Sequence, residues 1–290
     1  TTASNNTAVG NDALKANTTG TNNVALGVQA SALNTTGANN TALGRVCLYD
    51  NTTGQQNTAV GSGVLANNTT ADNNTGVGFE ALTQNTTGTQ NIAIGAYAAD
   101  ALTTGDDNVS IGYNSYSAST GGSDNNVIGS NSGRVISSGE RNNAHGKDTF
   151  YYLTTGQFNN AFGHSACQNV VTGSNNSAFG NIALKENLAS NNSAFGYRAL
   201  QANTTADQNT AIGADAMYTN TTGEYNVAMG YMALYTNNAS NNVAIGYQAL
   251  YLNTTGTNNV AVGKNALDAC TTSVSNVCVG NSAGGSMTTG

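Results

Sequence analysis

The chain of 290 residues contains no Pro and no Trp, has 35 Gly and 8% charged residues, and carries a net charge of −7. This composition argues against an ordinary globular domain, and the negative charge argues against a nucleic-acid partner, which clustered Lys and Arg would attract. No apolar run approaches the length of a membrane span, so we expect no membrane insertion by this segment. Because the chain opens on Thr1, we interpret it as a fragment of a longer chain.

A pentapeptide, Asn-x-Ala-apolar-Gly, recurs in 17 copies whose glycines are spaced by 16 or 17 residues. Its alternation of side chains has the period of two that is typical of a short strand. We therefore expect strands at residues 6–10, 23–27, 40–44, 57–61, 74–78, 91–95, 108–112, 125–129, 142–146, 159–163, 176–180, 192–196, 209–213, 226–230, 242–246, 259–263 and 276–280.

Each strand is followed by an Ala-Leu pair, as at 13–14, and then by Asn-Thr-Thr-Gly, as at 17–20. The pair predicts a second short strand, and Asn-Thr-Thr-Gly predicts a turn. A repeat of this length fits one coil of an all-β parallel β-solenoid, with 17 coils of 16–17 residues stacked by backbone pairing. The identical asparagines and glycines are expected to form structural ladders along the stack, beginning with Asn6, Asn23, Asn40, Gly10, Gly27 and Gly44.

At these residues the chain resembles a known family of surface fibres. The pentapeptide resembles the YadA-type head repeats of trimeric autotransporter adhesins, and the longer unit at 209–223 is similar to repeats of phage and viral tail-fibre-like proteins. The resemblance implies a left-handed β-roll, a side-by-side homotrimer and an extracellular location on a cell surface or a virion fibre. The period of this chain is longer than that of the typical adhesin head repeat.

We expect one continuous repeat domain in three parts: regular β-roll repeats at 1–112, irregular repeats of the same solenoid at 113–158, and regular repeats at 159–290. In the middle part the glycine spacing continues, whereas Thr-Thr gives way to Thr-Gly-Gly at 120–122 and to Ser-Ser at 137–138, and charged and aromatic residues gather. These changes fit either drift in a tolerant array or a modified zone that carries a ligand site.

The sequence offers little support for an enzyme, a cofactor or a metal site. The acidic residues are mostly isolated, and Asp106 and Asp107, the only adjacent pair, would point to opposite faces of a strand. His145 replaces an apolar residue in a column that we expect to face inward, where a neutral polar filler is a commoner role than a metal ligand. The four Cys show no CxxC spacing and are expected to act as small apolar residues, with a Cys270–Cys278 bridge within one coil as the alternative in an extracellular setting.

Six tyrosines form two columns at the spacing of the repeat. Tyr197, Tyr231 and Tyr247 directly follow their glycines, and Tyr218, Tyr235 and Tyr251 stand five residues after theirs. Stacked aromatic residues on one face could contact a receptor or a partner, or could form a purely structural ladder. These six residues are the candidate contact site of the regular array.

The sequence thus predicts a non-enzymatic extracellular fibre, the shaft or head of a trimeric tail fibre or surface adhesin, for attachment to a cell surface. Its partners would be itself, as a homotrimer or an end-to-end filament, and a cell-surface glycan or protein. An alternative is a self-assembling filament or matrix protein without a receptor. A lesser alternative is an ice-binding solenoid, because Thr-Thr pairs recur in 12 of the turns.

Overall fold

The computed structural model describes residues 2–289 as a parallel β-solenoid with no helix in that range, and this confirms the all-β parallel solenoid of the predicted fold class. The chain divides into two compact units between Ala144 and His145, called unit 1 and unit 2 below. The described residues contain 17 strands of three residues each: β1 (Thr7–Val9), β2 (Val24–Leu26), β3 (Thr41–Leu43), β4 (Thr58–Val60), β5 (Thr75–Val77), β6 (Ile92–Ile94), β7 (Val109–Ile111), β8 (Asn126–Ile128), β9 (Asn143–His145), β10 (Asn160–Phe162), β11 (Ser177–Phe179), β12 (Ser193–Phe195), β13 (Thr210–Ile212), β14 (Val227–Met229), β15 (Val243–Ile245), β16 (Val260–Val262) and β17 (Val277–Val279).

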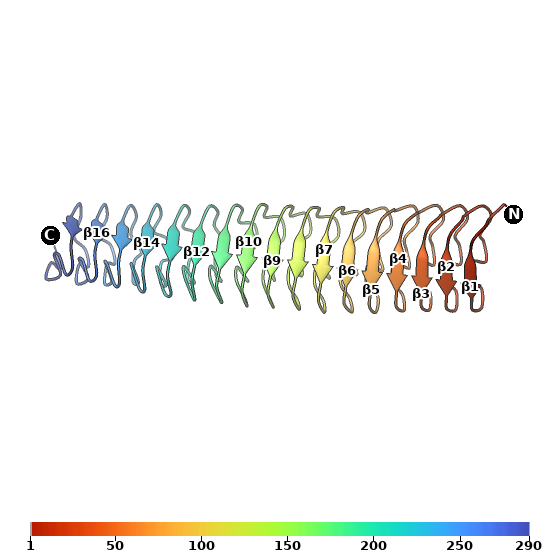
Figure 1. Ribbon diagram of the computed structural model, residues 1–290. Coiled ribbons are helices and arrows are strands. Elements are labelled where there is room, and N and C mark those ends of the chain that lie inside the picture. The colour runs from red at the N-terminus through yellow and green to blue at the C-terminus, as the bar shows by residue number, and fades with distance from the viewer. Residues whose placement is uncertain (1, 290) are drawn as a thin grey trace. The chain divides into compact units, whose positions relative to one another are not determined.

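Within each unit the strands lie side by side and pair in parallel, one coil on the next (Figure 1). In unit 1 the register joins β1 to β8, for example Ala25 opposite Ala42. In unit 2 it joins β10 to β17, with Ala178 opposite Ala194. Every strand falls within a predicted range, and the strand spacing continues through 113–158. The three-part division of the chain stays a prediction.

Each coil contains one strand, so the expectation of a second strand at the Ala-Leu pair was wrong. The residues two and four positions after the glycine adopt positive φ, for example 58° at Asp12 and 50° at Leu14. An extended strand requires negative φ, and the segment therefore curls into consecutive turns that direct Leu14 into the core.

The core is narrow and consists mainly of the inner alanine column, two residues before each glycine, and the core leucine column, four residues after it. Ala42 and Leu48 are typical members, and both are completely buried. The apolar residue directly before the glycine, which we expected to face inward, points outward instead. Leu26, for example, is 50% exposed, while its neighbour Ala25 is completely buried. Alternation along a strand sends neighbouring residues to opposite faces, and the narrow interior favours small residues, alanine in most coils.

Two asparagine ladders run along the coils. In the first, the backbone N–H of Asn40 donates to Oδ1 of Asn23 at 2.9 Å, and Nδ2 of Asn23 donates to the carbonyl of Gly37 at 2.8 Å. In the same way, the backbone N–H of Asn23 donates to Oδ1 of Asn6 at 2.9 Å. The second ladder is formed by the turn asparagines, which stand seven residues after the glycine in ten of the coils, and in it Nδ2 of Asn51 donates to Oδ1 of Asn34 at 2.8 Å. These bonds satisfy amides that are buried and would otherwise destabilise the coil.

The glycine that closes the pentapeptide packs against the next coil. Gly27 has φ of 141°, and a Cβ atom at this position would lie 2.3 Å from the carbonyl oxygen of Gly44. No other residue could occupy this corner without separating the two coils. Gly10 and Gly44 lie in the same column with φ of 133° and 142°.

Candidate binding surface

The second tyrosine column forms a continuous stack in unit 2. The ring centroids of Tyr218 and Tyr235 are 5.3 Å apart with an interplanar angle of 14°, and those of Tyr235 and Tyr251 are 5.3 Å apart with an angle of 23°. Because successive coils place identical residues one above another, the rings stack nearly parallel and cover one another's faces. No sugar ring fits between rings at this spacing, so a ligand of this column would contact the ring edges and hydroxyls.

The first tyrosine column is more exposed. Tyr197, Tyr231 and Tyr247 are 49%, 42% and 46% exposed. The rings of Tyr231 and Tyr247 stack with centroids 5.5 Å apart, and Nζ of Lys264 lies 5.9 Å from the centroid of Tyr247. This column therefore presents aromatic surface, which is enriched at protein interfaces, and the cation of Lys264 beside it.

Arg198 connects the two columns. Its Cζ atom lies 4.9 Å from the ring centroid of Tyr197 and 4.8 Å from that of Tyr218, so the guanidinium contacts one tyrosine of each column. Asp215 holds the guanidinium through two bonds, Nε to Oδ1 at 2.7 Å and the Arg198 Nη2 atom to Oδ2 at 3.0 Å. The six tyrosines consequently form one patch around this ion pair, which we call the tyrosine patch.

Electrostatics within the patch follow from these contacts. The hydrogen bond from Arg198 to Asp215 is the main reason that the pKa of Arg198 is raised above its usual value. Partial burial, followed by the neighbouring Tyr218, raises the pKa of Tyr235. The guanidinium stays charged and the phenol stays neutral at physiological pH, so the patch offers hydroxyl donors and acceptors beside one neutralised cation.

The tyrosines were predicted from the sequence as candidate contact residues, whereas Arg198, Asp215 and Lys264 were not. Arg198 and Asp215 occupy the same column, two residues after the glycine, in consecutive coils. Their ion pair could have been predicted from the sequence, because residues in one column of adjacent coils lie next to each other and these two carry opposite charges.

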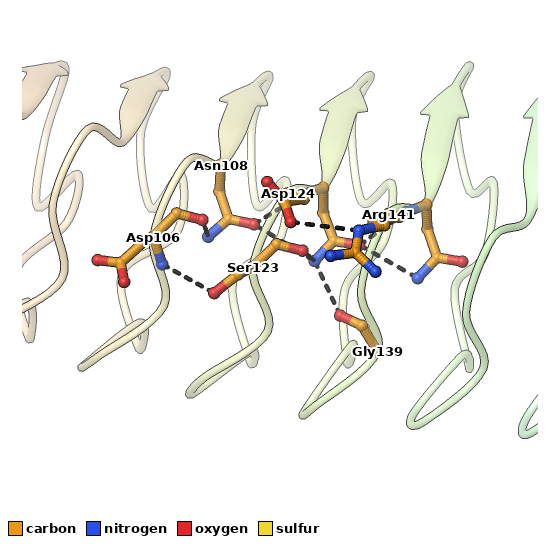
Figure 2. Close-up of polar contacts among 8 residues, drawn as sticks. Asp106, Asn108, Ser123, Asp124, Gly139 and Arg141 are labelled. Atoms are coloured by element: carbon orange, nitrogen blue, oxygen red, sulfur yellow. Dashed lines mark hydrogen bonds and ion pairs between the residues drawn. The ribbon is translucent and has the colours of Figure 1, made fainter.

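In the irregular repeats, other contacts between coils replace those of the regular ladders. Figure 2 shows the backbone N–H of Asp106 donating to Oγ of Ser123 at 3.0 Å, and Arg141 beside Asp124 at 3.5 Å. Nδ2 of Asn125 donates to the carbonyl of Gly139 at 2.9 Å, as in a regular coil. These residues thus make contacts between coils, and the ion pair of Arg141 and Asp124 stays about half exposed.

The two outer strand columns, three residues and one residue before each glycine, form the outward face of the strands. Neither column contains an Asp, Glu, Lys or Arg in any of the copies. In unit 1 Ile92 and Ile94 are 39% and 40% exposed. In unit 2 the rings of Phe162 and Phe179 stack 4.7 Å apart, those of Phe179 and Phe195 stack 4.9 Å apart, and Phe179 remains 37% exposed. We call this surface the outer strand face.

His145 belongs to the outer strand face rather than to the interior. Its ring stacks on Phe162 with centroids 4.6 Å apart, and burial lowers its pKa. Within residues 2–289 no three His, Cys, Asp or Glu side chains lie together as a metal site requires, and no enclosed pocket is present. In the part of the chain that the structure describes, no helix could span a membrane.

The cysteines and threonines take structural positions. All four Cys are free, and Cys47, Cys167 and Cys270 are buried. In unit 1 the first Thr of each turn uses its hydroxyl between coils, as Thr35 does toward the carbonyl of Thr52 at 3.0 Å. The second Thr is exposed in six consecutive coils, at Thr19, Thr36, Thr53, Thr70, Thr87 and Thr104.

A comparison with models of known protein families and with curated protein sequences finds no match for this chain.

Proposed function

We propose that the chain is a non-enzymatic structural segment of an extracellular fibre, in which copies associate side by side as a homotrimer and attach the fibre to a cell surface. The observation that carries the proposal is the outer strand face. The column directly before the glycine is apolar in every coil except at His145, the column three before it holds Val, Ile, Thr, Ser or Asn, and neither contains a charged Asp, Glu, Lys or Arg, which is unusual for a surface exposed to water.

The size of this face makes it a substantial part of an interface between copies. Eight strands at roughly 4.8 Å and a width of three residues at roughly 3.3 Å give about 380 Å² per unit. A stable interface buries about 800 Å² per partner, so the face of one unit supplies about half of that area. Cores of homo-oligomer interfaces are apolar and depleted in charge, as this face is.

The mass of the chain in solution tests the association. We expect light scattering to give the mass of three chains, and Phe179→Lys combined with Ile212→Lys to reduce it to one chain. A lysine pair on the exposed turns, Thr172→Lys with Thr205→Lys, is the control and should leave the mass unchanged. A single-chain mass for the unmodified protein would contradict the homotrimer, and open-ended assemblies would favour the self-assembling filament.

Attachment is assigned to the tyrosine patch, because it is the exposed aromatic surface that also carries hydrogen-bonding groups and a cation. Three copies side by side would present three weak sites and gain avidity. We expect Tyr235→Ala and Tyr251→Ala to weaken binding of the assembled protein to cells or glycans. Equal binding by these variants would remove the patch from the proposal and leave a shaft without a receptor site.

The exposed threonines of unit 1 favour ice binding as a second candidate function. Six consecutive coils place Thr19 and its equivalents on the surface at the spacing of the coils, roughly 4.8 Å. A thermal-hysteresis measurement decides this candidate. Absence of hysteresis at high protein concentration would exclude it.

A further inference from the structure

The first tyrosine column of unit 2 is interrupted by one small residue. Ala214 lies between Tyr197 and Tyr231, because the backbone N–H of Asp215 donates to the carbonyl of Tyr197 at 2.9 Å and that of Met232 donates to the carbonyl of Ala214 at 3.1 Å. The column therefore reads tyrosine, alanine, tyrosine in three consecutive coils. Two coils span roughly 9.6 Å, twice the distance between adjacent rings of a stack.

Unit 1 contains the same arrangement with the central position filled. Ala96 lies between Phe79 and Tyr113 with equivalent backbone bonds, from Tyr97 to Phe79 at 2.9 Å and from Asn114 to Ala96 at 3.1 Å. Here the ring of Tyr97, the residue after the alanine, stands between the two flanking rings. Its centroid is 5.4 Å from that of Phe79 and 6.2 Å from that of Tyr113, nearly perpendicular to both. Unit 1 thus shows that a six-membered ring fits over the alanine.

In unit 2 the residue after the alanine is Asp215, which turns away to bind Arg198 and is only 4% exposed. Ala214 is therefore flanked in its column by Tyr197 and Tyr231, and Asp215, the residue after it, supplies no ring. Cζ of Arg198 lies over the ring of Tyr197, 4.9 Å from its centroid, and the Arg198 side chain is 31% exposed. Asp215 engages two of the five guanidinium N–H groups, so others remain able to donate.

We propose that Tyr197, Ala214 and Tyr231 hold one neutral hexopyranose ring of a glycan, with Arg198 donating hydrogen bonds to the sugar hydroxyls. A pyranose presents C–H groups on its faces and hydroxyls around its edge. The C–H groups complement the negative faces of two tyrosine rings, and the hydroxyls can accept from the guanidinium. This inference rests on the proposed attachment function and gives its ligand class.

The charges of the site select against an acidic sugar. Asp215 neutralises the only cation at the position, and the chain as a whole carries a net charge of −7. A carboxylate on the ligand would have to compete with Asp215 for Arg198 and would be repelled by the chain. A single shallow site of this size is expected to bind weakly, with a Kd on the order of 1 mM, and to act through several copies on one fibre.

The test uses the full chain and a printed array of neutral oligosaccharides of glucose, galactose, mannose and N-acetylglucosamine, with acidic oligosaccharides printed beside them. Ala214→Tyr places a ring of the chain itself in the position, and Tyr231→Ala removes one wall. Both should reduce binding to the neutral glycan about tenfold or more. Tyr113→Ala in unit 1, where Tyr97 already fills the equivalent position, is the matched control and should bind as the unmodified chain does.

Binding of no neutral glycan by the unmodified chain would overturn the inference. Unchanged binding by a folded Ala214→Tyr or Tyr231→Ala variant, with thermal unfolding as the check on folding, would overturn it as well. The mass and the cell binding of the same variants separate this result from the proposed function. A chain that forms trimers and binds cells but fails these tests keeps the proposed function and loses only the sugar site.

Discussion

The hydroxyl of Tyr116 donates a hydrogen bond to the carbonyl oxygen of Gly122 at 3.0 Å. In a regular coil the same carbonyl is bound by the turn asparagine, as Asn51 binds Gly54 at 3.0 Å. Ser119 occupies the asparagine position in this coil, and its side chain is shorter. Tyr116, from the core leucine column, reaches the carbonyl instead. One substitution in the repeat is thus compensated by another three residues away.

Tyr116→Phe tests this compensation. The variant keeps the buried ring and removes the hydroxyl, which also accepts from Nδ2 of Asn125 at 3.1 Å. Both partners keep other bonds, because the carbonyl of Gly122 also accepts from Asn108 at 2.8 Å and Asn125 also donates to Gly139. We therefore expect a loss of about 1 kcal/mol in the free energy of unfolding, measured by chemical denaturation. Tyr113→Phe, at an exposed ring, should cost nothing, and an equal effect of both variants would refute the assignment.

Much of the fold could be predicted from the sequence, but a compensating contact such as that of Tyr116 could not. The pentapeptide located every strand because Gly and Asn recur at fixed positions. The orientation of the apolar column directly before the glycine could not be predicted. Either face of an alternating strand can point inward, and the small size of the core determines which one does. The prediction of a second strand at the Ala-Leu pair was wrong because positive φ at a residue such as Leu14 is rare and cannot be recognised from the amino-acid composition. The tyrosine columns could be recognised in the sequence, whereas the contacts of Arg198 depend on the register between adjacent coils.

Gly76 gives a second test of paired substitutions in the core. It takes the place of an inner alanine, and an added Cβ would lie 2.4 Å from Cγ1 of Val64. Val64 in turn replaces the alanine found three residues after most other glycines. We expect Gly76→Ala, which restores the consensus residue, to destabilise unit 1 by about 1–3 kcal/mol because it overpacks the core.

The double variant identifies the cause. Val64→Ala with Gly76→Ala reproduces two consensus residues, and its stability should exceed that of Gly76→Ala alone. Thermal unfolding of both single variants and the double variant gives the coupling energy. Additive effects of the two substitutions would show that the contact between Val64 and position 76 does not limit the stability.

The ion pair of the tyrosine patch should stabilise unit 2 as well as hold Arg198 in place. Asp215 is nearly buried, so Arg198→Ala leaves its carboxylate without its partner and should cost about 2 kcal/mol, discounted for the partial exposure of the arginine. Asp215→Asn combined with Arg198→Ala should recover part of that loss, because the charge that needs the partner is gone. Urea denaturation of the three proteins measures this. A double variant no more stable than Arg198→Ala would indicate that the loss comes from stacking on Tyr218 rather than from the carboxylate.

Alkaline pH should reveal the burial of Cys47. Burial raises the pKa of this thiol to about 11, above the value of about 8.5 that an exposed cysteine has when the chain is unfolded. The folded state therefore binds the proton more tightly, and the stability that this provides is present below pH 8.5 and is lost as pH rises toward 11. Cys47→Ala, the residue common at this position, should flatten the decline of stability over that range relative to the unmodified chain. In the unmodified chain an alkylating reagent at pH 9 should react with the half-buried Cys278 well before Cys47, and early modification of Cys47 would show that its coil opens readily.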